Sequence, residues 1–82
     1  MKFEWESRRH IYKRTSLYVL RCVDPINSIR AVFDTGDEYF SVFETHGETT
    51  PSLREDHDFP KELKKIKDKK AYVEVFMRLI CA

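Results

Sequence analysis

The sequence predicts a small α+β domain: an antiparallel β-sheet of three to five strands with one short helix near residues 60–68. Three observations support it: alternating apolar residues in the first half, one strong hairpin signal, and a lysine-rich segment after Pro60 with helical spacing. Either two open layers or a small curled barrel satisfies this order. The 82 residues, 41% of them hydrophobic, suffice for one core, so residues 1–82 are predicted to form a single domain.

The first two strands are predicted from their side-chain alternation. Phe3 and Trp5 alternate with charged residues, as in a strand that has one packed and one wet face. The segment "SLYVLRCV" is apolar on both parities, which is typical of a central strand. Pro25 ends this strand, because proline has no N–H to donate to a neighbouring strand.

A β-hairpin is the clearest local prediction, over "SIRAVFDTGDEYFSVFET". Ala31 and Phe33 share a parity on its first arm, and Phe40 and Val42 share one on its second. The intervening "DTGD" places Gly36 where a tight turn requires a positive φ.

The segment after the hairpin is predicted to be a loop, residues 45–58. It has one strong hydrophobic residue, Leu53, and is rich in acidic and turn-forming residues. Asp58 and Pro60 then suit a helix start, since an aspartate caps free amides and proline fits the first turn.

Residues 71–80, "AYVEVFMRLI", fit two structures. Their alternation and their β-branched and aromatic content favour a last strand. A longer helix is the alternative, because Glu74 and Arg78 are spaced as an i,i+4 ion pair.

The near-neutral net charge of +1 conceals a segregation of charge along the chain. Residues 1–33 carry seven Lys/Arg against three Asp/Glu, residues 34–58 carry one against eight, and residues 59–82 carry seven against three. Such a distribution produces acidic and basic patches that steer charged partners, unless folding interleaves them.

We expect a cytoplasmic protein that does not contact a membrane. No segment reaches the roughly 18 apolar residues of a membrane span, and "MKFEWESRR" lacks the apolar run of a signal peptide. Cys22 and Cys81 have no C-x-x-C spacing, so they are expected to be buried or idle thiols.

No pattern in the sequence predicts enzymatic activity, a cofactor or a catalytic residue. Two glycines leave little material for a phosphate-binding loop, and neither G-x-S-x-G nor H-E-x-x-H occurs. Glu44, His46 and Glu48 alternate, with His57 between two aspartates further on, but such spacing arises readily by chance in an acidic segment. We therefore expect no metal site.

The leading functional prediction is a small non-enzymatic protein that binds, and thereby inhibits or adapts, a larger intracellular protein. Its contact surface is expected in the acidic hairpin and loop or on the basic segment 8–14. Exposed loops that combine charge with a ring are common contact surfaces. The contact residues predicted in the acidic hairpin and loop are Asp34, Asp37, Glu38, Tyr39, Glu48, Glu55 and Asp56.

The alternative is a small RNA- or DNA-binding domain, because cations interleaved with an aromatic ring suit phosphates and stacked bases. Its residues would be Arg8, Arg9, His10, Tyr12, Lys13, Arg14, Lys64 and Lys65. An extended backbone would place Arg8, His10, Tyr12 and Arg14 on one face and Arg9, Ile11 and Lys13 on the other. That division argues against one flat phosphate-binding stripe.

A third hypothesis is an oligomer that sequesters a nucleotide in pockets between subunits. The sequence leaves the oligomeric state open. The size and charge of the chain are compatible with accessory proteins of bacteria or their viruses.

Overall fold

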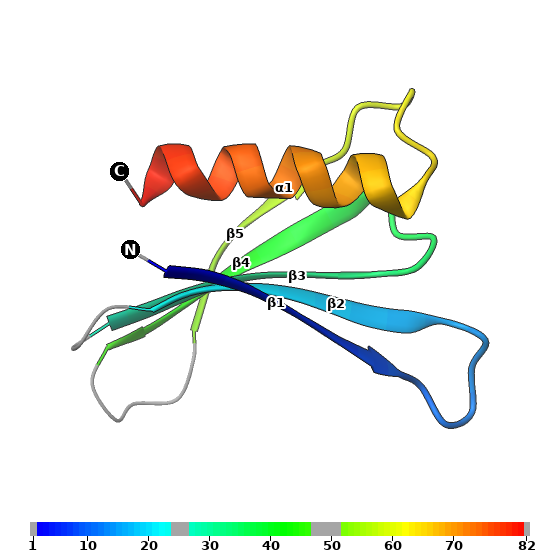
Figure 1. The fold of residues 1–82 in the computed structure, drawn as a ribbon, viewed down its shortest axis with the longest axis horizontal. Coiled ribbons are helices and arrows are strands. Elements are labelled where there is room, and N and C mark those ends of the chain that lie inside the picture. The colour runs from blue at the N-terminus through cyan, green and yellow to red at the C-terminus, as the bar shows by residue number, and fades with distance from the viewer. Residues whose placement is uncertain (1, 24–26, 47–51, 82) are drawn as a thin grey trace.

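Five antiparallel strands form one sheet in chain order, and a helix lies across one face of it (Figure 1). The computed structural model describes residues 2–23, 27–46 and 52–81. The elements are β1 (Lys2–Arg9), β2 (Ser16–Val23), β3 (Asn27–Asp34), β4 (Tyr39–His46), β5 (Ser52–Asp58) and α1 (Ile66–Ile80). The predicted α+β class is therefore confirmed.

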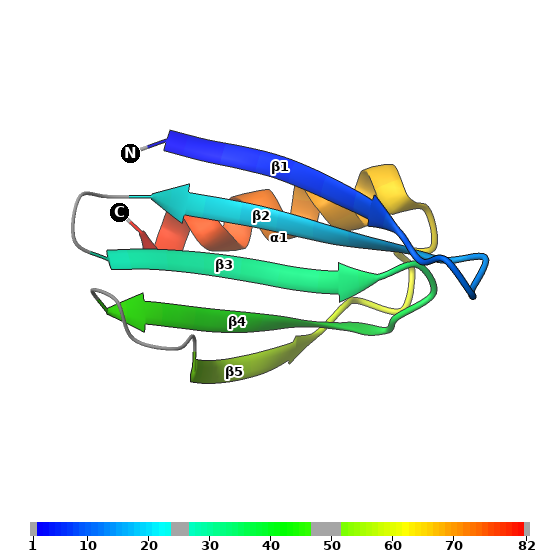
Figure 2. The ribbon, with the colours of Figure 1, turned by 90° about the horizontal axis from the view of Figure 1, so that it is seen from below.

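The sheet is an open meander rather than a barrel. Each strand pairs with the next along the chain, and β1 and β5 are the two edges. Figure 2 shows the five strands side by side, with α1 behind them. The two ends of the chain lie near each other at one end of the sheet, opposite the β1–β2 and β3–β4 turns (Figure 1).

The core lies between α1 and the sheet face that α1 covers. The alternation of β2, β3 and β4 places on this face residues that are 0–1% exposed: Leu20, Ala31, Phe33, Phe40 and Val42. From α1, Val73 and Met77 are fully buried against them.

Aromatic rings fill the centre of this core. Phe33 stacks on Tyr18 at 5.3 Å between centroids and meets Trp5 and Phe59 edge-on at 6.4 and 5.2 Å. Such geometries add to the energy of apolar burial. Lys70 of α1 lies over the Trp5 ring, with Nζ 4.8 Å from its centroid, so the helix also covers the edge strand β1.

The loop predicted at residues 45–58 is wrong for residues 45–46, which end β4, and for residues 52–58, which form β5 along the edge of β4. An edge strand presents charged side chains to water, and charges there discourage pairing with other chains. The acidic composition that indicated a loop is thus compatible with an edge strand. Residues 47–51 lie outside the described residues.

The helix begins later and ends later than predicted, because residues 60–65 precede it and α1 spans Ile66–Ile80. The favoured strand at residues 71–80 is wrong, and the alternative is confirmed: Arg78 Nη2 lies 3.1 Å from Glu74 Oε1. Val75 and Leu79 are 60% and 73% exposed, so their alternation with Val73 and Met77 does not reflect a buried strand face.

The predicted hairpin is confirmed as β3 and β4. Gly36 has φ +87°, a backbone conformation that residues other than glycine rarely adopt. Cys22 and Cys81 are buried thiols that form no disulfide with each other, as expected. No helix within the described ranges is long and apolar enough to span a membrane.

We expect Phe33→Ala to lower the free energy of unfolding by about 3–5 kcal/mol, because it leaves a cavity among the rings of Trp5, Tyr18 and Phe59. Phe33→Leu, which keeps most of the volume, is expected to cost about 1–2 kcal/mol. Urea unfolding measures both. Val75→Ala, at an exposed position of α1, is the control and should change stability by less than about 0.5 kcal/mol. A Phe33→Leu variant as stable as wild type would contradict this packing.

Candidate functional site

Three connections that are distant in the sequence lie at the same end of the sheet, with the β3–β4 turn between the other two (Figure 1). They are the β1–β2 turn, the β3–β4 turn and the connection from β5 to α1. His10 Nε2 lies 2.8 Å from Asp34 Oδ1, and the Phe59 N–H donates to the Glu38 carbonyl at 2.8 Å. Folding therefore brings predicted acidic and predicted basic residues together at this end.

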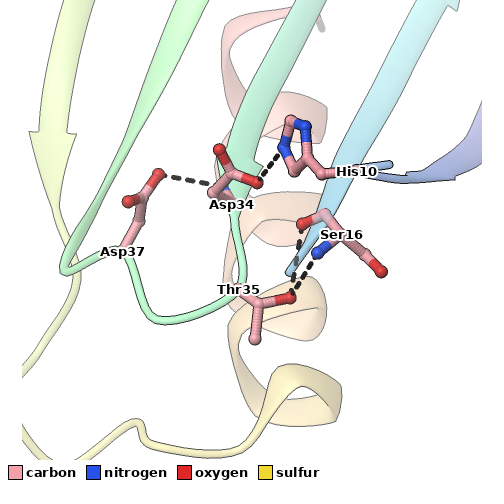
Figure 3. Close-up of polar contacts among 5 residues, drawn as sticks. All are labelled: His10, Ser16, Asp34, Thr35 and Asp37. Carbon is pink, nitrogen blue, oxygen red and sulfur yellow. Dashed lines mark hydrogen bonds and ion pairs between the residues drawn. The ribbon is translucent and has the colours of Figure 1, made fainter. Parts of the chain in front are cut away.

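The β3–β4 turn is held to β2 by a small polar network (Figure 3). The Thr35 N–H donates to the Ser16 carbonyl at 2.9 Å, and the Ser16 N–H donates to Thr35 Oγ1 at 3.0 Å. Asp37 Oδ2 accepts the Asp34 N–H at 2.8 Å. The carboxylates of Asp34 and Asp37 thus have structural partners within the network.

The other described residues of the predicted acidic surface lie on two neighbouring parts of the sheet. Glu38 and Tyr39 are exposed at the β3–β4 turn, with Tyr39 45% exposed. Glu55 and Asp56 lie on β5, where Asp56 Oδ1 accepts a hydrogen bond from Ser41 Oγ at 2.5 Å. Glu48 lies outside the described residues. The described residues of this predicted surface are therefore divided between the β3–β4 turn and the edge strand β5.

The predicted basic segment is a hairpin tip rather than an extended strand. β1 ends at Arg9 and the chain bends through residues 11–14, so the expected division of side chains between two faces is wrong beyond Arg9. Ile11 and Tyr12 are 90% and 98% exposed at the tip. Lys64 and Lys65 are exposed on the helix side of the sheet, in the connection to α1 that Figure 1 shows.

The sheet face opposite α1 carries a shallow groove that sequence reasoning missed. The groove has a volume of about 170 Å³. Its floor is formed by Leu17, Val19 and Val32, which are half-buried, and its charged rim by Arg8, Arg21, Arg30 and Glu6. We call these seven residues the open-face groove.

The open-face groove concentrates positive charge with few carboxylates to balance it. Arg21 and Arg30 are directly opposite each other on β2 and β3, and facing like charges are unfavourable. Glu6 Oε1 lies 3.4 Å from Arg21 Nη1. Arg8 and Arg30 have no ion pair with any described residue. An anionic group above the groove would relieve this repulsion.

The alternation of side chains along β2 predicts part of this groove from the sequence. Arg21 follows Leu17 and Val19 on the parity opposite to the buried Leu20 and Cys22. Its position facing Arg30 depends on the strand register, which the sequence alone does not supply.

His57, which lies between the two aspartates of β5, packs at the edge of the core and is partly exposed. Its ring packs against Phe76 at 4.3 Å and Phe40 at 5.5 Å between centroids. Nε2 lies 3.0 Å from Glu55 Oε1, although the geometry does not meet that of a hydrogen bond. Among the described residues, no three His, Cys, Asp or Glu side chains are grouped to hold a metal ion.

No protein-family model matches the chain, and comparisons with curated proteins and with solved structures found no similar protein. The functional interpretation therefore rests on the residues of the chain itself.

The polar network predicts a contrast between two Thr→Val substitutions. Thr35→Val leaves the Ser16 N–H without its acceptor and should lower the free energy of unfolding by about 1–3 kcal/mol. The control is Thr45→Val, because Thr45 Oγ1 is buried with no hydrogen-bond partner among the described residues. We expect that variant to be as stable as wild type or more so. Urea unfolding checks both, and equal effects would contradict the network.

Proposed function

We propose that the protein is a non-enzymatic interaction module that binds an acidic segment of a larger intracellular protein. The proposed contact is the open-face groove, with the β1–β2 hairpin tip as an extension of it. One observation carries this proposal. Two arginines on the rim of the groove, Arg8 and Arg30, form no ion pair with a carboxylate of any described residue, and they stand beside an aliphatic floor.

The chemistry of the groove suits an acidic peptide that also has apolar side chains. A guanidinium matches a carboxylate with two parallel hydrogen bonds, so Arg8 and Arg30 offer two such positions. Between them the half-buried floor of Leu17, Val19 and Val32 offers an apolar surface to one aliphatic or aromatic side chain. Arginine is also enriched among the residues that dominate binding energy at interfaces.

A peptide fits this groove better than a nucleic acid does. Nucleic-acid-binding surfaces without sequence preference stack bases on aromatic rings, and no residue that lines the groove is aromatic. Glu6 on the rim can accept a hydrogen bond from a peptide N–H, a donor that the nucleic-acid backbone lacks. The acidic contact predicted from the sequence, at residues 34–58, stays a prediction.

Selection of phage-displayed random dodecapeptides on the immobilised protein tests the proposal. We expect enrichment of peptides with Asp or Glu on both sides of a large apolar residue. Arg8→Glu with Arg30→Glu should weaken binding of a selected peptide at least about 100-fold, since it removes two charge-assisted contacts of about 1.5 kcal/mol each.

The matched control is Lys65→Glu with Lys67→Glu, which changes the net charge equally on exposed residues outside the groove. Its affinity should stay within about threefold of wild type, because distant exposed charges are screened by salt. Equal losses in both double variants, or no enrichment of acidic peptides, would refute the proposal.

Binding of single-stranded nucleic acid is a second candidate, favoured by the hairpin tip. Tyr12 is 98% exposed and is flanked by Arg9, Lys13 and Arg14, which form no ion pair with described residues. An exposed ring among cations can stack on a base while the cations neutralise phosphates.

For this candidate, the affinity for a labelled oligothymidine of about 20 nucleotides should fall steeply with salt, by about 0.7 log unit per decade for each phosphate contact. Replacing Arg9, Lys13 and Arg14 with Ala should flatten that slope by about two units, and Tyr12→Ser should weaken binding about 5- to 100-fold. Fluorescence anisotropy measures both effects. No binding at low salt would exclude this candidate.

A further inference from the structure

Lys69, in the first turn of α1, is buried although it carries a charge. It is 5% exposed, and no other charged side chain among the described residues is buried. Its Nζ donates to the Asp37 carbonyl at 2.6 Å and lies 5.3 Å from the centroid of the Phe59 ring. It forms no ion pair with a carboxylate of any described residue.

A buried ammonium without a counter-ion is costly, because it has lost water and gained no opposite charge. An ammonium also has three N–H donors, of which the Asp37 carbonyl uses one. Carbonyl and ring contacts offset part of the cost. Lys69 therefore has both the charge and the donors to bind an anion.

Lys69 also lines a pocket of about 330 Å³ between the β3–β4 turn and the β5–α1 connection. This volume is at the lower end of the range for pockets that hold small molecules. The pocket has an apolar part made by Phe59, Pro60 and Leu63. The polar lining residues beside Lys69 are Lys61, Lys64, Glu38 and Asp58.

We propose that this pocket binds a small organic anion, a phosphate or carboxylate attached to a flat apolar body. The anionic group would pair with Lys69, and with Lys64 at the exposed side of the pocket. The flat body would lie against Phe59 and Leu63.

Glu38 and Asp58 narrow the class of ligand further. Their carboxylates would repel a second anionic group but accept hydrogen bonds from amino or hydroxyl groups on the body. A purine mononucleotide combines these features. The pocket shares no lining residue with the open-face groove, so the proposal does not rest on the proposed peptide binding.

Titration with adenosine monophosphate, benzoate and inorganic phosphate, followed by calorimetry and by the melting temperature, tests this proposal. We expect adenosine monophosphate or benzoate to bind and to raise the melting temperature, since a ligand of the native state stabilises it. Inorganic phosphate, which lacks a flat body, should bind at least about tenfold more weakly than the better of the two. The first two probes distinguish a phosphate from a carboxylate as the anionic group.

Lys69→Met keeps the apolar stem and removes the charge, and should weaken binding at least about tenfold. Its urea midpoint should equal or exceed that of wild type, because no unpaired ammonium is buried. Lys64→Gln, at an exposed position, should weaken binding about two- to fivefold without affecting folding. Lys67→Met is the matched control on an exposed residue of α1 that does not line the pocket, and it should bind as wild type does.

Two results would overturn the proposal. One is that neither organic anion binds the wild-type protein. The other is that binding persists unchanged in Lys69→Met and Lys64→Gln. A lower urea midpoint for Lys69→Met, together with no binding to wild type, would assign Lys69 a structural role only.

Discussion

The structure depends on the packing of one helix against one face of a five-stranded sheet. Every strand from β1 to β4 places alternate side chains under α1, and Phe33 lies at the centre of the rings that result. The 15-residue helix α1 covers only one face of the sheet. The side chains of the other face are not packed in the core, so they can be polar or charged. The same alternation that builds the core therefore also builds the open-face groove, because Leu17 and Val19 point away from α1 wherever Tyr18 and Leu20 point toward it.

Local signals determined which parts of the fold could be predicted. The β3–β4 hairpin depends on a period of two and on a glycine with positive φ, and both can be recognised within a few residues. β5 depends on pairing with β4, and a charged edge strand has the composition of a loop. In residues 71–80, Val73 and Met77 satisfy a strand period and a helix period alike. Packing against the sheet determines that this segment is a helix rather than a strand. That packing involves residues far away in the sequence, so the segment alone does not reveal it.

The candidate surfaces followed the same division between local and non-local information. Tyr12 and its neighbouring cations were predicted as a cluster, because they are adjacent in the sequence. The grouping of Arg8 with Arg21 and Arg30 requires the register of three strands, so composition alone does not reveal it. In the sequence, nothing distinguishes Lys69 from its neighbouring lysines. On α1, however, Lys69 lies on the same helix face as Val73 and Met77, and that face packs against the sheet. Its burial depends on the orientation of the helix.

The position of the chain ends has a practical consequence for work on this protein. Both ends lie at the side of the sheet opposite the charged turns, as Figure 1 shows. A fluorescent protein, an affinity tag or a surface tether joined at either end would thus extend away from the hairpin tip and from the Lys69 pocket. A tandem fusion of two copies through a flexible linker would leave both hairpin tips accessible, and it would raise the local concentration of one copy near the other.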